Sequence, residues 1–121
     1  MTHTKPLLIV EDEQLLAHAL ALKMEHDGFT THVALTGKEG LQEALTGKYG
    51  VILLDLMLPI VDGFGILEAM REKNVSTPVI ILTNLGQDKD RERAKSLGAK
   101  EYFVKADTPI ADILKKVKEI L

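Results

Sequence analysis

The chain contains no cysteine, which excludes disulfide scaffolds, thiolate zinc sites and cysteine nucleophiles. It also lacks a long apolar run. The longest one, from Val51 to Val61, is interrupted by Asp55 and Pro59 and is too short to span a bilayer. Residues 1–6 read MTHTKP and hold no apolar stretch of the kind that a signal peptide needs. These absences are typical of a cytoplasmic protein with no membrane segment.

A strong excess of one charge is missing as well. The formal net charge is −3 and the acidic and basic residues are interspersed, so the chain shows no basic footprint for nucleic acid. Its 121 residues predict a single domain, 1–121, and a hydrophobic fraction of 45% is enough for a core. The sequence has no internal repeat, low-complexity segment or linker. We expect only residues 1–5 and 84–89 to be loose.

Short apolar runs alternate with longer segments in which apolar residues recur at helical spacing. The short runs predict strands at residues 7–10, 30–35, 51–54, 78–82 and 100–104. The periodic segments predict helices at about residues 13–27, 37–46, 63–73, 88–97 and 109–121. On the first helix, the expected apolar face consists of Leu15, Leu16, Ala19, Leu20 and Met24. On the last helix, it consists of Ile110, Ile113, Leu114, Val117, Ile120 and Leu121.

The expected helix ends carry suitable residues. Three glycines are predicted to end helices: Gly28, Gly47 and Gly98. Asp62 and Thr108 are suited to cap the helices that follow them, and Pro109 suits a first helical position. The charged run at residues 88–93 is typical of a solvated helix face.

The alternation of strands and helices predicts an α/β fold. Near-continuous apolar strands are typical of a parallel sheet that helices cover on both faces. Right-handed crossovers then bring the carboxyl end of every strand to the same edge of the sheet. Ligands of such doubly wound sheets bind at that edge, beside the point where the strand order reverses.

Polar residues follow four of the predicted strands, and we expect them to meet at this edge: Glu11, Asp12, Asp55, Thr83 and Lys105. Three neighbouring carboxylates repel one another, and a hard divalent cation such as Mg²⁺ relieves that repulsion. Lys105 adds a positive charge and Thr83 a hydroxyl donor. Such a site suits the receipt of a phosphoryl group, and a carboxylate can itself be the nucleophile that becomes an aspartyl phosphate.

With these residues, the chain resembles the receiver domains of two-component response regulators, in particular the stand-alone chemotaxis regulators. The resemblance covers residues 7–121. It is carried by IVEDE at 9–13, LDLMLP at 54–59, DG at 62–63, LT at 82–83 and YFVK at 102–105. It implies a flavodoxin-like fold of five βα units, with the strands in the order 2-1-3-4-5.

The resemblance also implies roles for the metal and the phosphoacceptor. Asp55 would accept a phosphoryl group from the phosphohistidine of a sensor histidine kinase or a phosphotransfer protein. Asp12 would bind Mg²⁺ directly, and Glu11 would act largely through water. Asp55 and the backbone carbonyl of Met57 would complete the protein ligands, and Mn²⁺ could replace Mg²⁺.

A switch is implied in the same way. Thr83 would bond a phosphoryl oxygen, and Lys105 would pair with the phosphoryl group or with Asp55. On phosphorylation Thr83 would move and Tyr102 would turn inward, which would repack the face formed by the fourth helix, fifth strand and fifth helix for a downstream protein target. The chemistry would be confined to the chain's own phosphoryl group, so the protein would not be an enzyme.

Two positions depart from the usual receiver pattern, and two others bear on the lifetime of the phosphoryl group. Ala106 follows Lys105 where the family usually carries a proline, often after a cis bond. We expect a trans Lys105–Ala106 bond and a different path into the last helix, because a cis bond before a non-proline residue costs about 2.5–4 kcal/mol. Asn84 stands where a small alanine is common. Met57 and Leu85 are apolar and cannot orient an attacking water, which predicts a long-lived aspartyl phosphate.

Taken singly, the same residues have plainer explanations. Glu11 or Asp12 could cap the first helix, and Asp55 could form a structural ion pair with Lys105. A phosphatase of the haloacid-dehalogenase type would need a second aspartate where Met57 stands. An FMN carrier would need a phosphate loop free of acids after the first strand. A phosphorylation-independent pseudo-receiver would normally have lost Asp12, Asp55 or Lys105.

Two alternatives stay open for the larger context. The chain is either a stand-alone receiver or a receiver cut from a longer DNA-binding regulator, and Met1 favours the first. We expect no direct nucleic-acid or membrane partner for the chain itself. It would be a monomer, or a dimer formed through the face of the fourth and fifth helices on phosphorylation.

Overall fold

The structure is a computed structural model that describes residues 5–121, so the expectation of a loose segment at residues 1–4 lies outside the described residues. Five parallel strands form one sheet in the order β2-β1-β3-β4-β5, as predicted. The strands are β1 (Leu7–Val10), β2 (Thr31–Ala34), β3 (Val51–Leu54), β4 (Val79–Thr83) and β5 (Glu101–Val104). The helices are α1 (Gln14–His26), α2 (Gly37–Ala44), α3 (Gly63–Glu72), α4 (Asp88–Ser96) and α5 (Ile110–Ile120).

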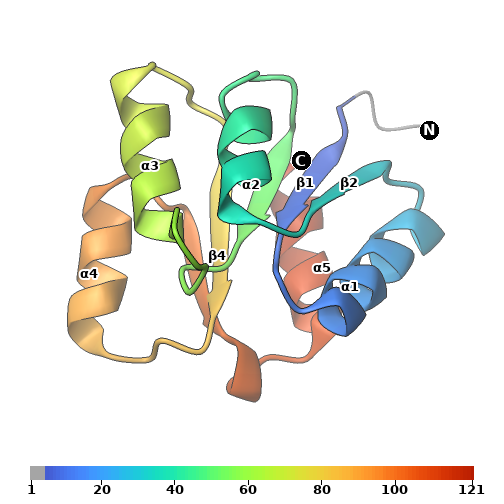
Figure 1. Ribbon diagram of the computed structural model, residues 1–121. Helices are drawn as coiled ribbons and strands as arrows, with labels where there is room; N and C mark the ends of the chain where they lie inside the picture. Colours follow the sequence, from blue (N-terminus) through green and yellow to red (C-terminus); the bar gives the residue numbers. More distant parts are fainter. Residues whose placement is uncertain (1–4) are drawn as a thin grey trace.

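The sheet is the middle layer of three (Figure 1). Helices α1 and α5 cover one face, and α2, α3 and α4 cover the other. Because side chains alternate across a strand, successive residues of the buried strands enter different cores. On β3, for example, Ile52 and Leu54 pack with α2 and α3, whereas Val51 and Leu53 pack with α1 and α5. Burial of both faces explains why β1 and β3 are apolar throughout and why β4 is apolar up to its last residue, Thr83.

The register aligns the carboxyl ends of the central strands. Val10 pairs with Leu54, and Leu54 pairs with Ile81. The ladder continues one step past β1 and β3, since the amide of Asp55 donates to the Val10 carbonyl at 3.0 Å. The order reverses at β1, where the chain crosses to β2 on one side and to β3 on the other. The predicted ligand edge is therefore the edge at which β1, β3 and β4 end.

Most of the predicted helix ends are confirmed. The Asp62 carboxylate accepts the Gly65 amide at 2.9 Å and caps α3. Gly28, Gly47 and Gly98 have φ of 94°, 72° and 103°, a left-handed conformation that costs glycine little and stops a helix. The prediction for α5 is wrong, because Thr108 does not cap it. The Thr108 hydroxyl instead donates to the Val104 carbonyl at 2.8 Å, across a 3₁₀ turn at Lys105–Asp107, and Pro109 occupies the N-cap position.

The apolar face of α1 also differs from the prediction. Its buried residues are Ala17, Leu20, Ala21 and Met24, whereas Leu15 is 88% exposed. Alanines at 17 and 21 let the helix approach the sheet closely and complete an i, i+3, i+4, i+7 stripe that excludes Leu15. On α5, Ile113, Leu114 and Val117 are buried as expected, but Leu121 lies beyond the helix and is exposed.

Candidate functional site

Glu11 is a buried acid directly after β1. Its side chain is almost completely removed from solvent, yet both carboxylate oxygens have partners. Oε1 lies 2.8 Å from Lys105 Nζ, and Oε2 accepts the Glu13 amide at 3.0 Å. Burial raises the pKa of Glu11 above its ordinary value, although the hydrogen bonds from Lys105 and the Glu13 amide oppose the shift. The fold therefore removes the Glu11 carboxylate from water and replaces the lost water contacts with two protein donors, the Lys105 ammonium and the Glu13 amide.

Asp55 is the second buried acid, at the end of β3. Its Oδ1 accepts the backbone amide of Met57 at 3.0 Å, and its Oδ2 accepts a hydrogen bond from Lys105 Nζ at 2.8 Å. The first bond is local, because the chain turns immediately after the strand. The second comes from Lys105, directly after β5, on the far side of β4. The carboxylate is thus fixed from two directions.

Lys105 is the cation of the site and follows β5. Its ammonium group lies within 3.3 Å of three carboxylates, those of Glu11, Glu13 and Asp55. Burial acts to lower the pKa of Lys105, but the hydrogen bonds to Asp55 and Glu11 outweigh burial and raise the pKa well above its ordinary value. Lys105 therefore stays charged at any physiological pH.

Glu11, Asp12 and Asp55 form a group that could hold a metal ion. One carboxylate oxygen from each lies within 4.8 Å of the others, and Asp12 alone of the three is exposed. Within residues 5–121, this is the one group of three or more acids or histidines with such geometry. All the donors are carboxylate oxygens, which fits a hard cation such as Mg²⁺ or Mn²⁺. The residues present therefore suit the predicted ion, with Asp12 open to solvent as an entry point.

Thr83 and Tyr102 lie on the neighbouring strands β4 and β5. Thr83 is completely buried, and its hydroxyl accepts the Leu85 amide at 3.4 Å. The Tyr102 hydroxyl donates to the Leu85 carbonyl at 2.5 Å. Both predicted switch residues thus contact the same residue of the loop between β4 and α4. A movement of this loop would disturb both bonds.

The loop between β3 and α3 carries backbone strain beside the cluster. Ile60 has φ of 68° and its side chain is fully exposed. A β-branched residue rarely adopts this left-handed conformation, which costs about 1–2 kcal/mol. Gly63, the first residue of α3, is in very close contact with the chain after β3, since a Cβ there would lie 2.5 Å from the Asp55 carbonyl oxygen. Glycine at this position lets the start of α3 pass close behind Asp55.

The sequence-predicted residues are thus largely brought together. Glu11, Asp12, Asp55 and Lys105 form one cluster, and Thr83 ends the adjacent strand. The suggested cap function fails, because Glu13 is the N-cap residue of α1 and no side chain caps it. The ligand role of the Met57 carbonyl stays a prediction. No cis peptide bond occurs in the described chain, so the trans Lys105–Ala106 bond is confirmed.

Two contacts escaped the sequence analysis. Glu13 pairs with Lys105 at 3.3 Å, and the Tyr102 hydroxyl holds the Leu85 carbonyl. The first could have been suspected from the acidic run at 11–13, since a third acid at the same strand end needs a partner. The second had no signal in the sequence, because a backbone carbonyl is an acceptor at almost every position.

Comparison with known proteins identifies the family. The model of the response regulator receiver domain matches residues 7–118, so the chain belongs to the receiver domains of two-component response regulators. A similar curated protein is the response regulator ArlR of Staphylococcus saprophyticus, 39% identical over 115 residues. Another is the transcriptional regulatory protein DltR of Streptococcus agalactiae, 37% identical over 116 residues. These alignments cover 95% and 93% of the chain but 51% and 52% of the relatives, so the chain spans about half of their length.

Solved structures agree with this assignment. The receiver domain of the Francisella response regulator 1452 has a TM-score of 0.89 and 32% identity, over 97% of this chain and 96% of that one. A CheY-like receiver domain protein from Methanospirillum hungatei has a TM-score of 0.87 and 26% identity, over 97% and 93%. No helix among residues 5–121 is both long enough and apolar enough to cross a membrane.

Proposed function

We propose that Asp55 is the phosphoacceptor of this receiver domain and that the reaction depends on Mg²⁺. The donor would be a phosphohistidine on a sensor histidine kinase or phosphotransfer protein. A carboxylate oxygen of Asp55 forms a bond to phosphorus, the P–N bond breaks, and the departing imidazole takes up a proton. The observation that carries the proposal is a buried Asp55 carboxylate that shares a cluster of acidic oxygens with Glu11 and Asp12 and lies 2.8 Å from Lys105.

Each residue has a part in holding the acceptor. The Met57 amide fixes Oδ1 of Asp55, which orients the carboxylate before the donor arrives. Lys105 neutralises charge on the acceptor and then on the phosphoryl oxygens. Glu11, Asp12 and Asp55 would hold the metal ion, with the Met57 carbonyl as a further ligand. When bound, Mg²⁺ offsets the negative charge of the acids and of the phosphoryl group.

The switch would run through the loop after β4. In the proposal, the Thr83 hydroxyl leaves the Leu85 amide for a phosphoryl oxygen, a bond that is charge-assisted and therefore stronger. Leu85 then moves, and Tyr102, which donates to the Leu85 carbonyl, moves with it. The face of α4, β5 and α5 changes, and a downstream protein target or a second copy of the chain reads it.

The phosphoryl group would be lost slowly. Met57 is half exposed beside Asp55, and Leu85 follows Thr83 by two residues. Neither side chain can orient or activate a water molecule. Met57→Asn or Leu85→Glu should therefore accelerate dephosphorylation, as followed by intact mass over time. Loss within minutes in the unchanged protein, unaffected by either substitution, would contradict this part of the proposal.

The chain would act only on its own phosphoryl group, so we do not propose an enzyme. Because phosphohistidine donors are made from ATP, its place of action would be the cytoplasm. An alternative is that this receiver works within a longer regulator, because its curated relatives extend beyond the matched half and one is named a transcriptional regulatory protein. DNA binding would then belong to the remainder of such a protein.

The test is intact mass after incubation with acetyl phosphate and Mg²⁺. The proposal predicts a gain of one phosphoryl group that is absent with EDTA and absent from Asp55→Asn. A matched control is Asp112→Asn, which alters an exposed aspartate on α5 and should leave the gain intact. No gain from acetyl phosphate or from a phosphorylated histidine phosphotransfer protein would identify a pseudo-receiver.

A further inference from the structure

The methionines of the described chain differ sharply in exposure. Met24 is completely buried in the core beneath α1 and α5, and Met70 is 3% exposed in the core beneath α2 and α3. Met57, in the loop after β3, is 52% exposed and belongs to neither core. The chain contains no cysteine. Within residues 5–121, Met57 is therefore the one residue whose sulfur solvent reaches freely.

This exposed side chain is anchored beside the proposed phosphoacceptor. The backbone amide of Met57 donates to Asp55 Oδ1 at 3.0 Å, which holds the backbone of Met57 next to the carboxylate. A methionine side chain is unbranched and flexible, so its terminal atoms can reach over the carboxylate from that anchor. Chemistry at the Met57 sulfur would therefore take place next to the group that carries the phosphoryl.

An exposed thioether can react with a hydroperoxide. A lone pair on sulfur attacks one oxygen of hydrogen peroxide, an S–O bond forms and the O–O bond breaks. Sulfur loses a pair of electrons to the peroxide, and the departing hydroxide takes the proton of the transferred oxygen and leaves as water. The product is methionine sulfoxide, which replaces a flexible apolar group with a polar one. Burial withholds Met24 and Met70 from this reaction.

The fold should tolerate oxidation at Met57. Because this side chain lies outside both cores, a new oxygen atom there stays in contact with water. Its backbone amide and carbonyl are not altered, so the bond to Asp55 persists. The same oxygen on Met24 or Met70 would enter an apolar core and disrupt it. Met57 is thus a place where oxidation can regulate the protein without damaging its fold.

We propose that Met57 is a site of reversible oxidation by hydrogen peroxide or a related hydroperoxide, and that its sulfoxide shortens the life of the phosphoryl group on Asp55. The assignment of the site is independent of phosphorylation, whereas the effect on lifetime rests on the proposed function. Oxidising conditions would then return the receiver to its unphosphorylated state, and a methionine sulfoxide reductase would reset it.

The effect on lifetime follows from what the new oxygen can bind. A thioether sulfur is a weak acceptor and does not position water. The sulfoxide oxygen accepts a hydrogen bond from a water molecule and holds that water for attack on phosphorus. The water oxygen bonds to phosphorus, and the bond between phosphorus and the Asp55 oxygen breaks. Inorganic phosphate leaves with the protons of the water shared between phosphate and solvent, and the Asp55 carboxylate is restored.

The first experiment locates the oxidation. Hydrogen peroxide is added in steps to the folded chain, and mass spectrometry of its peptides places each added oxygen. We expect Met57 to react well before Met24 and Met70, and all three to react at similar rates in urea. Reaction of a buried methionine as fast as Met57 in the folded chain would overturn the site. Loss of the fold on oxidation of Met57, detected by circular dichroism, would overturn it as well.

The second experiment measures the lifetime. The chain oxidised at Met57 is freed of peroxide, phosphorylated with acetyl phosphate and Mg²⁺, and freed of donor, and its intact mass is followed. We expect dephosphorylation to be faster by roughly threefold to tenfold, the factor that one added hydrogen bond to the attacking water would give. Sulfoxide reductases for both epimers should restore the longer lifetime. An unchanged or longer lifetime after oxidation would overturn the proposed regulation.

Two substitutions show whether the sulfur is responsible. Met57→Leu keeps an apolar side chain of similar volume without sulfur. Whatever lifetime this variant has, peroxide treatment should not change it, and an equal acceleration in Met57→Leu would overturn the proposal. Met57→Gln places an amide oxygen near the position of the sulfoxide oxygen and should accelerate dephosphorylation without peroxide.

This inference and the proposed function fail in different ways. Normal phosphorylation, with a lifetime that does not respond to oxidation at Met57, would contradict this inference alone. No phosphorylation of the untreated chain, from acetyl phosphate or from a phosphorylated phosphotransfer protein, would contradict the proposed function and with it the effect on lifetime. The peptide masses would still decide whether Met57 is the oxidation site.

Discussion

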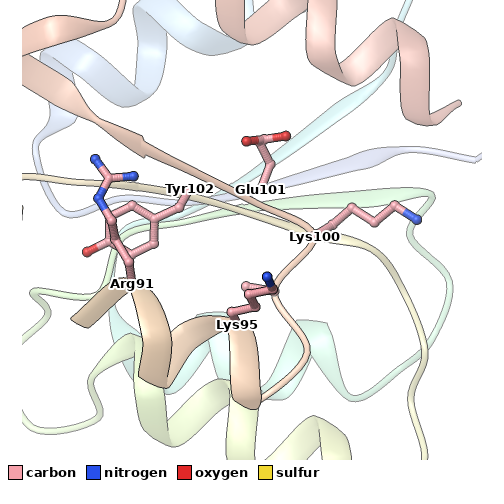
Figure 2. Close-up of a pocket in the computed structure, with 6 residues that line it drawn as sticks. Arg91, Lys95, Lys100, Glu101 and Tyr102 are labelled. Atoms are coloured by element: carbon pink, nitrogen blue, oxygen red, sulfur yellow. The ribbon is translucent and has the colours of Figure 1, made fainter. Parts of the chain in front are cut away.

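Two charged regions adjoin β5 and are built in opposite ways. At the carboxyl edge, Glu11 and Asp55 are buried, and both pair with Lys105 at 2.8 Å. A cavity of about 270 Å³ between α4 and β5 is lined by Arg91, Lys95, Ala99, Lys100, Glu101 and Tyr102 (Figure 2). In this cavity, Arg91 and Lys95 are exposed and have no acidic partner in the described chain. The first region is desolvated and internally compensated, so changes there should alter folding stability. The second is hydrated and uncompensated, so changes there should leave folding stability almost unchanged.

The sharpest test of this contrast is the removal of one lysine from each region. Lys105→Ala leaves Glu11 and Asp55 buried without their cation, and we expect it to lower the free energy of unfolding by about 3 kcal/mol at pH 7. Lys100→Ala removes an exposed lysine of the cavity and should change it by less than about 0.5 kcal/mol. Urea unfolding measures both. Equal effects would remove the distinction between the regions.

The loss in Lys105→Ala should depend on pH. Removing Lys105 takes away a hydrogen bond that holds down the pKa of Glu11, so that pKa rises further above its ordinary value. The folded variant then binds more protons than the unfolded chain, and its stability falls as pH rises above about 4.5. The difference in free energy of unfolding between the unchanged protein and Lys105→Ala should therefore be smallest near pH 4.5 and grow toward pH 7. A deficit independent of pH would contradict the electrostatic cause.

Mg²⁺ should stabilise the acidic cluster by an amount that depends on its concentration. At a Mg²⁺ concentration of 100 times its dissociation constant, the free energy of unfolding should rise by about 2.7 kcal/mol. The reason is that only the folded chain brings Glu11, Asp12 and Asp55 together. Thermal unfolding with Mg²⁺ and with EDTA measures the gain. Asp12→Ala should lose most of it, whereas Asp112→Ala on α5 should keep it. A gain that survives in Asp12→Ala would place the ion elsewhere.

Tyr102 lies between the two regions, and its hydroxyl should contribute less to the free energy of unfolding than Lys105 or bound Mg²⁺. Tyr102→Phe loses the hydrogen bond to the Leu85 carbonyl, which is worth about 1 kcal/mol. Hydrogen exchange should also accelerate in the loop after Thr83, because its carbonyl anchor is gone. Unchanged exchange in that loop would show that Tyr102 does not hold it, and the proposed connection would then fail.

The smallest effect is expected at Glu13, on the rim of the cluster. Its pair with Lys105 spans 3.3 Å, and its side chain is 62% exposed. Glu13→Gln should change the free energy of unfolding by at most about 0.5 kcal/mol, as is usual for exposed ion pairs. A loss comparable to that of Lys105→Ala would mean that the rim, and not the buried pairs, anchors the lysine.

The fold was predictable where local pattern and burial agree. The runs that form β1, β3 and β4 are apolar on both faces, and the polar residues at their ends predict the acidic cluster from the sequence alone. Predictions failed where a choice depended on tertiary packing. The sheet covers an alanine-containing stripe of α1 and leaves Leu15 in solvent, and the Thr108 hydroxyl finds a carbonyl across a 3₁₀ turn. Neither choice is encoded in local propensity.

The candidate site shows the same division. That Asp55 and Lys105 meet followed from parallel topology, which brings strand ends together regardless of side-chain detail. The cavity was not foreseen, because the run at 88–93 reads as a solvated helix face and Arg91 does belong to such a face. Its stacking on Tyr102 depends on the distance between α4 and β5, which the sequence does not specify.

The most direct test of the central claim follows both regions in one experiment. Amide spectra of the ¹⁵N-labelled chain are recorded with Mg²⁺ before and after acetyl phosphate, beside the same titration of Asp55→Asn. We expect the signals of Asp55 and Met57 to shift together with those of Leu85 and Tyr102, and the corresponding signals of Asp55→Asn not to respond to acetyl phosphate. An unchanged spectrum, or the same shifts in Asp55→Asn, would contradict the assignment of Asp55 as the phosphoacceptor.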